Sequence, residues 1–405
     1  MSPLRAAPHP EIPLLLSCSR PKIDFKDADR IKELCQNNID WNYLLRLAGR
    51  HALMPILFHH LNSICPEAVP GPILSRLKNH FNANLGYNRF LTGELLKLLS
   101  LFENHGIPAI PFKGPVLASS VYGDLSLREF SDLDIMIRKQ DFSKVKDLLL
   151  SQGYLPIYRL NSLQERASIK LQCQFHFRHE KNGVNLEIFW EFGSKGLSSP
   201  VNLHHLWDRL EKVSFFGKEI LAFSPEASLH VLCFHGYKHA WEALEWICDI
   251  AGLIQIHQDM DWKRVREEAG GVDSERTLFL GLYLAKHLLN VNLPDNLWQR
   301  VQSDAKIKSL AWMVRKHLFT ERKGLFGALE RSFFHIRLIK PLWKQLRYCY
   351  YLVIPPSLVE FEILKLPSSF FFLYYLFRPL RLLGKYSVGR LINSFLATNA
   401  SISKE

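Results

Sequence analysis

A β-hairpin near the middle of the chain constrains the fold more strongly than any other segment. Residues 172–179 alternate between apolar and polar side chains, and residues 184–191 do so again. A period of two is typical of strands that bury one face, and the intervening Asn182-Gly183 pair is a preferred two-residue hairpin turn. The chain therefore contains an antiparallel strand pair and is not an all-helical protein.

Two further strands are predicted upstream of the hairpin. Residues 107–112 form a short apolar run that suits a strand, and a short helix is expected from Pro115 to Val121. Residues 130–137 then alternate, which places Asp132 and Asp134 on one face of a strand and apolar residues on the other.

The remaining segments show helical periodicity. Helices are expected within 27–63, 76–104, 142–152, 225–270 and 275–289. We therefore expect an α+β protein in which a small mixed β-sheet is embedded in a mainly helical chain. The length of 405 residues, at about 150 residues per domain, suggests two or three domains. The pattern divides the chain into an N-terminal helical region (1–95), a sheet-bearing core (96–215), a helical domain (216–330) and basic, aromatic-rich helices (331–405).

The strand carboxylates are the strongest candidates for chemistry. Asp132 and Asp134 share a strand face, and Glu187 is presented by the hairpin. Close carboxylates repel unless a cation lies between them, and their hard oxygens suit Mg²⁺ bound together with substrate phosphates. Three such groups could form a two-metal site for displacement at phosphorus. A lone Asp-x-Asp pair, however, is more often an exposed acidic strand face.

Residues near the carboxylates favour a phosphate site. Lys113-Gly114 lies between a predicted strand and a predicted helix. There, glycine lets the backbone approach a ligand, and lysine supplies a positive charge. Arg128, just before the Asp132 strand, is a second candidate phosphate contact.

Taken in order, these motifs resemble a known family. FKGP at 112–115, YGD at 122–124 and LREFSDLDI at 127–135 are similar to the uncharacterised nucleotidyltransferase family of bacteria, within the DNA-polymerase-β-like nucleotidyltransferase superfamily. LEIFWE at 186–191 and LCFHGYKHAW at 232–241 resemble later motifs of that family. The resemblance implies that residues 96–215 form a nucleotidyltransferase-like core.

The resemblance also implies an activity. A nucleoside monophosphate would move from an NTP to an acceptor, with Mg²⁺ or Mn²⁺ as cofactor. Asp132, Asp134 and Glu187 would bind the metal, and Glu187 would help to activate the acceptor hydroxyl. The acceptor stays open among a sugar, a small metabolite, a protein and RNA.

The expected nucleotide contacts depart from the superfamily pattern. Lys113 and Gly114 stand where Gly-Ser usually holds the triphosphate, so the grip on phosphate would fall to Lys113 and backbone amides, with Arg128 and Ser131 beside them. Phe189 also replaces a histidine after the third carboxylate. A second hypothesis is therefore a binding or scaffolding protein that keeps the fold and has lost turnover.

Two histidines need a separate interpretation. His235 and His239 are four residues apart and share a helix face, which is one way to ligate a metal. No third ligand accompanies them, so we prefer a packed or hydrogen-bonded pair. The alternative is that one of them, or Lys238, faces the nucleotide cleft. Asp249 is a candidate hydrogen-bond partner for a histidine.

Positive charge is concentrated near the C-terminal end. The chain carries a net charge of +12, and residues 311–405 hold 15 Lys and Arg against 5 Asp and Glu. Aromatic residues interleave with these cations between 343 and 386. This composition suits a buried helix pair with a basic rim, which we prefer, then peripheral membrane contact through 331–405, then nucleic acid. No specific DNA-binding module is recognisable.

Cysteine usage and hydropathy indicate a cellular location. The 7 cysteines form no CxxC pair, and no stretch reaches the roughly 18 uninterrupted apolar residues of a spanning helix. Unpaired cysteines are typical of a reducing compartment. We therefore expect a cytoplasmic protein, with association at the membrane surface as the alternative.

Overall fold

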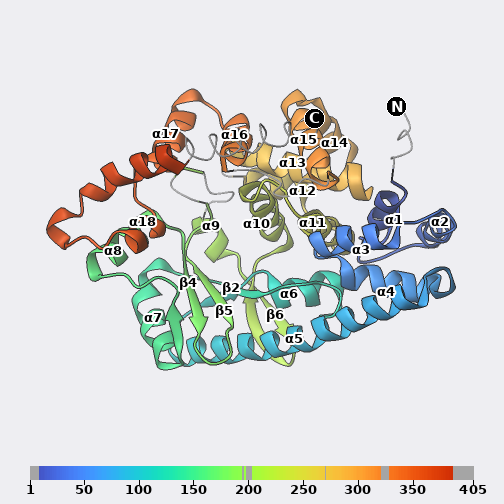
Figure 1. Cartoon of the computed structure of the whole chain (residues 1–405), viewed down its shortest axis with the longest axis horizontal. Helices are drawn as coiled ribbons and strands as arrows, with labels where there is room; N and C mark the ends of the chain where they lie inside the picture. Colours follow the sequence, from blue (N-terminus) through green and yellow to red (C-terminus); the bar gives the residue numbers. More distant parts are fainter. Residues whose placement is uncertain (1–8, 194–195, 198–202, 270, 321–327, 386–405) are drawn as a thin grey trace, which may run out of the picture.

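The computed structural model describes residues 9–193, 196–197, 203–269, 271–320 and 328–385 (Figure 1). Helices dominate it, as expected. The helices of the N-terminal part and the core are α1 (Glu11–Ser17), α2 (Phe25–Cys35), α3 (Trp41–Arg50), α4 (Met54–Ile64), α5 (Gly71–Asn104), α6 (Gly114–Leu117), the π-helix η2 (Ala118–Tyr122), α7 (Phe142–Ser151), α8 (Ser162–Leu171) and α9 (Leu203–Asp208). They are followed by α10 (Pro225–Lys238), α11 (Glu245–Ile256), α12 (Trp262–Glu267), α13 (Val272–Leu289), α14 (Asp295–Ser303), α15 (Ala305–Leu318), α16 (Ala328–Leu338), α17 (Leu342–Val353), α18 (Leu358–Ile363) and a helix over 373–385.

The central β-sheet has the strand order β1-β2-β5-β4-β3. Its strands are β1 (Ala109–Pro111), β2 (Asp132–Ile137), β3 (Tyr154–Pro156), β4 (Gln174–His179) and β5 (Asn185–Phe189). β2 and β5 run parallel, and the other neighbouring pairs are antiparallel. A small mixed sheet in a mainly helical chain confirms the predicted α+β class.

The predicted hairpin is β4 and β5. The backbone N–H of His179 donates to the Val184 carbonyl oxygen over 2.9 Å, and Gly183 adopts a φ of 72° in the turn. The connection is longer than the predicted two-residue turn: residues 180–183 join the strands, and the Gly183 N–H donates to the His179 carbonyl oxygen over 3.0 Å. Glycine tolerates the left-handed conformation at 183 without strain.

The two faces of the sheet belong to two different hydrophobic cores. Leu133, Ile135, Leu186 and Ile188 are fully buried on one face and pack with the C-terminal half of α5 and with α7. On the other face, Phe189 joins a larger core that is built from helices. The alternation read from the sequence therefore separates the two faces correctly. The polar residues between the apolar ones lie on the side of the sheet that faces the larger core.

The larger core joins the N-terminal helices to the later ones. Apolar residues of α1 to α4 pack in one cluster with residues of α10, α11, α13 and α15. His51, at the end of α3, bridges this junction: its Nδ1 accepts the N–H of Leu244 over 3.2 Å, and its Nε2 lies 3.0 Å from the carbonyl oxygen of Leu318. The segment boundary drawn at residue 95 lies within α5, which crosses the base of the molecule (Figure 1). The division into four domains stays a prediction.

A second, two-stranded sheet is a structural element that the sequence analysis did not predict. It consists of β6 (Glu211–Phe215) and β7 (Lys218–Ala222). Its turn residues Phe216 and Gly217 both adopt positive φ, at 47° and 80°. Asn, Asp or Gly usually occupies the first of these positions, so Phe216 hides the turn signal. The three-residue strand β3 was also not predicted, because it is too short for a period to show.

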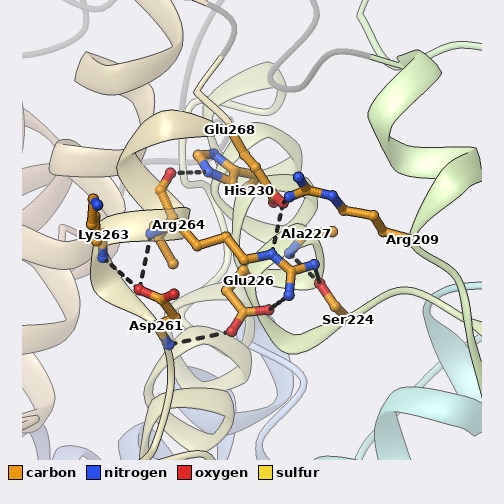
Figure 2. Close-up of polar contacts among 10 residues, drawn as sticks. Arg209, Ser224, Glu226, Ala227, His230, Asp261, Lys263, Arg264 and Glu268 are labelled. Carbon is orange, nitrogen blue, oxygen red and sulfur yellow. Dashed lines mark hydrogen bonds and ion pairs between the residues drawn. The ribbon is translucent and has the colours of Figure 1, made fainter.

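Arg264 organises a polar cluster that fixes α12 against α10 (Figure 2). Its Nε donates to Glu268 over 2.9 Å, and its guanidinium lies 3.7 Å from the carboxylate of Glu226. His230 Nε2 lies 2.6 Å from the carbonyl oxygen of Val265. These contacts hold α12 against α10.

The C-terminal helices differ from the preferred prediction of a buried pair. Tyr348 and Tyr374 are buried as expected, but Trp343, Tyr350 and Phe372 are exposed. The prediction fails for Trp343 and Tyr350 because α17 buries only one face, and for Phe372 because it lies in the turn before the helix over 373–385. The part of this segment after residue 385 lies outside the described residues. Within the described chain, no helix combines the length and hydropathy needed to cross a bilayer.

Candidate functional site

The three predicted carboxylates lie on the neighbouring strands β2 and β5, on the side of the sheet that faces the larger core. In the parallel β2–β5 register, Asp134 is the partner of Glu187, and Asp132 is the partner of Asn185. Residues two apart on a strand point to the same side, so Asp132 projects beside Asp134. All three carboxylates line a single cavity of about 770 Å³.

Asp134 is the most buried of the three, and its partner is Lys113. The ammonium of Lys113 lies 3.0 Å from Asp134 Oδ2. Burial raises the pKa of Asp134 to about 6, and the positive charge of Lys113 opposes part of that rise. Burial alone would lower the pKa of Lys113, but the carboxylates of Asp134, Asp132 and Glu187 outweigh it and raise the pKa. Lys113 therefore neutralises the acidic group.

The unpaired oxygen of Asp134 decides whether these residues fit a metal ion. Asp134 Oδ1 is buried and has no hydrogen-bond partner among the described residues, and a buried, unpaired carboxylate oxygen is a position where a cation gains most. The described chain contains no cluster of three His, Cys, Asp or Glu already arranged around one point. The oxygen donors are of the kind that suits a divalent cation, but the Lys113 ammonium lies beside Asp134 where such an ion would bind.

Glu187 is held by a short chain of hydrogen bonds. His176 Nδ1 lies 3.0 Å from Glu187 Oε1, and Gln174 Nε2 donates to Oε2 over 2.8 Å. Lys238 Nζ in turn donates to Gln174 Oε1 over 3.0 Å. Burial would raise the pKa of Glu187, but His176, Lys113 and Lys238 lower it below its usual value. Glu187 is therefore ionised and fixed in orientation.

Gly114 and Ser131 lie where nucleotide contacts were predicted. Gly114 has a φ of 51°, and a Cβ there would lie 3.4 Å from the backbone oxygen of Asp132. Only glycine allows this close, left-handed approach without strain. Ser131 is exposed, and both residues line the cavity that the carboxylates share.

The opposite wall of the cavity carries the histidines. The rings of His235 and His239 lie 4.8 Å apart, and each lies within 5.4 Å of the Trp246 ring. All three residues line the cavity together with Lys238. Burial lowers the pKa of both histidines, and Lys113 and Lys238 lower it further. The two histidines therefore pack against each other, as we expected. They also line the cavity, as the alternative interpretation required.

The part of the chain that forms this cavity matches a known protein family. The family model described as uncharacterised nucleotidyltransferase matches residues 37–290. The chain belongs to this family. The match spans the sheet, α5 and the helices α10 and α11 that enclose the cavity, and it confirms the family that the sequence motifs indicated.

Two solved structures are similar to this nucleotidyltransferase-family chain. The antibiotic-resistance factor ANT(2'')-Ia has a TM-score of 0.33 and 10% identity, over 49% of this chain and 98% of its own. The lincosamide antibiotic adenylyltransferase LnuA, solved with lincomycin bound, has a TM-score of 0.27 and 22% identity, over 40% of this chain and 96% of its own. No curated protein matches the chain.

Arg128 has a protein partner instead of an open face. Its guanidinium donates to both oxygens of Asp249, through Nε over 2.9 Å and Nη2 over 2.8 Å, and Tyr122 OH also donates to Asp249. Glu245 lies 3.8 Å from the same guanidinium. Arg128 lines the cavity, so its role as a phosphate contact stays a prediction. The expectation that Asp249 pairs with a histidine is wrong, because the buried arginine takes both of its oxygens.

The loop that carries Arg128 is held by α5, which the sequence analysis did not connect to the site. Asn84 Nδ2 donates to the carbonyl oxygens of Ser126 and Arg128, and Asn88 Nδ2 donates to those of Leu125 and Arg128. These amides satisfy backbone groups that a buried loop would otherwise leave unpaired. Asparagines on one helix face, 37 to 44 residues from the loop, give no local signal of this role.

Proposed function

We propose that this protein is a divalent-metal-dependent nucleotidyltransferase, in which Asp132, Asp134 and Glu187 hold Mg²⁺ or Mn²⁺ and an NTP is the donor. The proposal rests on Asp134 Oδ1, which is buried and has no hydrogen-bond partner in the described part of the chain, and which lies on a sheet face shared with two further carboxylates. When bound, the metal would stabilise negative charge on the reacting phosphate.

The reaction is a displacement at the α-phosphorus. The acceptor hydroxyl oxygen forms a bond to that phosphorus, the bond from phosphorus to the pyrophosphate oxygen breaks, and pyrophosphate leaves. Glu187, ionised and oriented by His176 and Gln174, accepts the hydroxyl proton. The Lys113 ammonium leaves Asp134 and binds the triphosphate, and Gly114 and Ser131 line the phosphate side of the cavity.

The acceptor enters from the β4 side of the sheet in this proposal. Nucleophile and leaving group lie on opposite sides of phosphorus in an in-line displacement, and Lys113 places the leaving group near β1. A neighbouring cavity of about 310 Å³ lies at the start of β4, and Lys238 lines both cavities. Its far wall includes Tyr348 and Tyr351, which lie beyond the family match, so acceptor choice is assigned to the C-terminal helices.

A binding or scaffolding protein without turnover is the second candidate. The observation that favours it is the Lys113–Asp134 ion pair, which already neutralises the position that a metal would take. Such a protein would be indifferent to divalent ions, and this difference separates the two candidates.

The test is thermal unfolding with each of the four NTPs, with and without Mg²⁺ or Mn²⁺. A ligand at about 100 times its Kd adds about 2.7 kcal/mol to the free energy of unfolding. We expect such a metal-dependent shift with at least one NTP. Asp134→Asn should abolish the shift while the protein stays folded, whereas Asp147→Asn, an exposed carboxylate on α7, should retain it. No shift with any nucleotide would favour the second candidate.

A further inference from the structure

Exposed apolar side chains gather on the C-terminal helices. Among the described residues, 15 of the 23 exposed large apolar side chains lie between Trp312 and Leu383. Scattered exposed apolar residues are ordinary, but a concentration in one segment marks an interaction surface.

The exposed residues of α17 form one continuous helix face. Leu342, Leu346 and Tyr350 follow one another at intervals of four residues and are 67%, 63% and 50% exposed. Residues four apart lie on the same side of a helix. Tyr348, on the opposite side, is buried and hydrogen-bonds to His335. The helix is therefore anchored through one face and leaves an apolar face to solvent.

The helix over 373–385 repeats this arrangement. Leu376, Leu380 and Leu383 are spaced by four and three residues and are all exposed, whereas Tyr374 is buried. Arg378 of this helix donates to the carbonyl oxygen of Leu352 through Nη2 over 2.8 Å, which ties the helix to α17. Figure 1 shows the two helices on the same side of the molecule, in orange-red and red. The Arg378 contact and Figure 1 place the two helices next to each other, and each has an apolar face open to solvent.

Cations border these apolar faces. Lys340, Arg347 and Lys365 are exposed in the same segment, and the Arg347 guanidinium lies 5.4 Å from the centroid of the Trp343 ring. Of the two acidic residues in 331–385, Glu360 is buried between Arg378 and Arg381, and Glu362 is exposed. The segment 311–405 as a whole holds 15 basic against 5 acidic residues. An apolar face with a basic border complements an anionic lipid surface.

We propose that α17 and the helix over 373–385 form a docking surface for an anionic membrane. The leucine faces enter the boundary between headgroups and acyl chains, Trp343 lies at headgroup depth, and the exposed cations pair with lipid phosphates. This proposal is independent of nucleotidyl transfer. It would place the cavity lined by Tyr348 and Tyr351, on the other side of α17, close to the lipid surface.

The experiment is flotation of the full-length protein with vesicles of phosphatidylcholine, with and without phosphatidylglycerol. We expect binding to the anionic vesicles only, and loss of that binding in high salt. The double variant Leu346→Glu, Leu380→Glu should bind at least about tenfold more weakly, because each substitution replaces an apolar side chain that would be buried in lipid with a negative charge. Leu150→Glu, which changes an exposed leucine on α7, is the matched control and should bind as the wild type does.

Several outcomes would overturn the proposal. One is absence of the full chain from floated vesicles, and another is equal binding of the double variant and the wild type. A dimer in solution that the double variant dissociates would assign the surface to a second copy of the chain. Flotation that appears only after residues 386–405 are deleted would assign it to that segment.

Discussion

The ion pair between Lys113 and Asp134 makes the charge balance of the site testable without a substrate. Lys113→Met keeps most of the side-chain length but removes the ammonium that lies 3.0 Å from Asp134 Oδ2. Removal of one partner of a buried ion pair typically costs about 3–5 kcal/mol, because the remaining charge is left uncompensated. With a pKa of about 6 in the wild type, the carboxyl of Asp134 can avoid that cost by binding a proton, so at pH 7 we expect a decrease of about 1–2 kcal/mol in the free energy of unfolding.

The decrease should depend on pH with a definite sign. Burial already raises the pKa of Asp134 from 3.8 to about 6. A raised acidic pKa costs stability as pH rises from the unfolded towards the folded pKa, here about 3 kcal/mol by neutral pH. Without the ammonium the pKa rises further, so the penalty of the variant grows above pH 6. Near pH 4, where the carboxyl is protonated in the folded protein, the gap between variant and wild type should fall below half its neutral value.

Urea unfolding at neutral pH and at about pH 4.5, with and without Mn²⁺, measures this prediction. Mn²⁺ should stabilise Lys113→Met more than the wild type, because the ion supplies the missing positive charge. Lys263→Met, which removes an exposed lysine from α12, is the control and should leave stability unchanged. The reasoning would be refuted by a loss that is equal at both pH values, or by a loss below about 1 kcal/mol.

Three further predictions concern the scaffold of the site. Asp249→Asn should lower the free energy of unfolding by about 3–5 kcal/mol in a urea titration, since Arg128 is left buried without its bidentate partner; a loss under 1 kcal/mol would contradict this. Burial lowers the pKa of His51 from 6.5 to about 4, so the folded protein holds this side chain neutral. Its contribution to the free energy of unfolding is therefore complete above pH 6.5 and is lost as pH falls from 6.5 to 4. That change amounts to about 3 kcal/mol, and His51→Gln should flatten it in a pH series of thermal unfolding. Gly114→Ala should cost about 1–2 kcal/mol, because φ is 51° there, and an unchanged Tm would show that the turn relaxes.

The strands and the carboxylate face could be predicted because their signals are local. Alternation over 130–137 and 184–191 separates Asp132, Asp134 and Glu187 from the buried face, and the parallel register then makes Asp134 and Glu187 neighbours. The helix expected from residue 225 is also confirmed: α10 begins at Pro225, and the Ser224 side chain accepts the N–H of Ala227. Short-range periodicity and capping chemistry are sufficient for such features.

The partners of the charged side chains could not be predicted in the same way. Arg128 and its partner Asp249 are 121 residues apart in the sequence, and Asn88 is 37 to 40 residues from the backbone carbonyls that it binds in the loop at 125–128. These pairings depend on how α5 and α11 pack, which no local pattern encodes. Lys113 was predicted next to phosphate because lysine after a strand favours that role, but the sequence does not reveal the ion pair between its ammonium and Asp134.

The continuous helix α5 has a consequence for how the protein unfolds. Its 34 residues form a rod of about 50 Å; one half is buried in the helical core, and the other half lies against the sheet. Between them, Asn84 and Asn88 hold the loop at 125–128. Unfolding of either core would fray α5 and release the loop, so we expect that neither core opens alone and leaves the carboxylate-lined cavity intact. Two cores that would otherwise melt separately are thereby coupled into one cooperative unit.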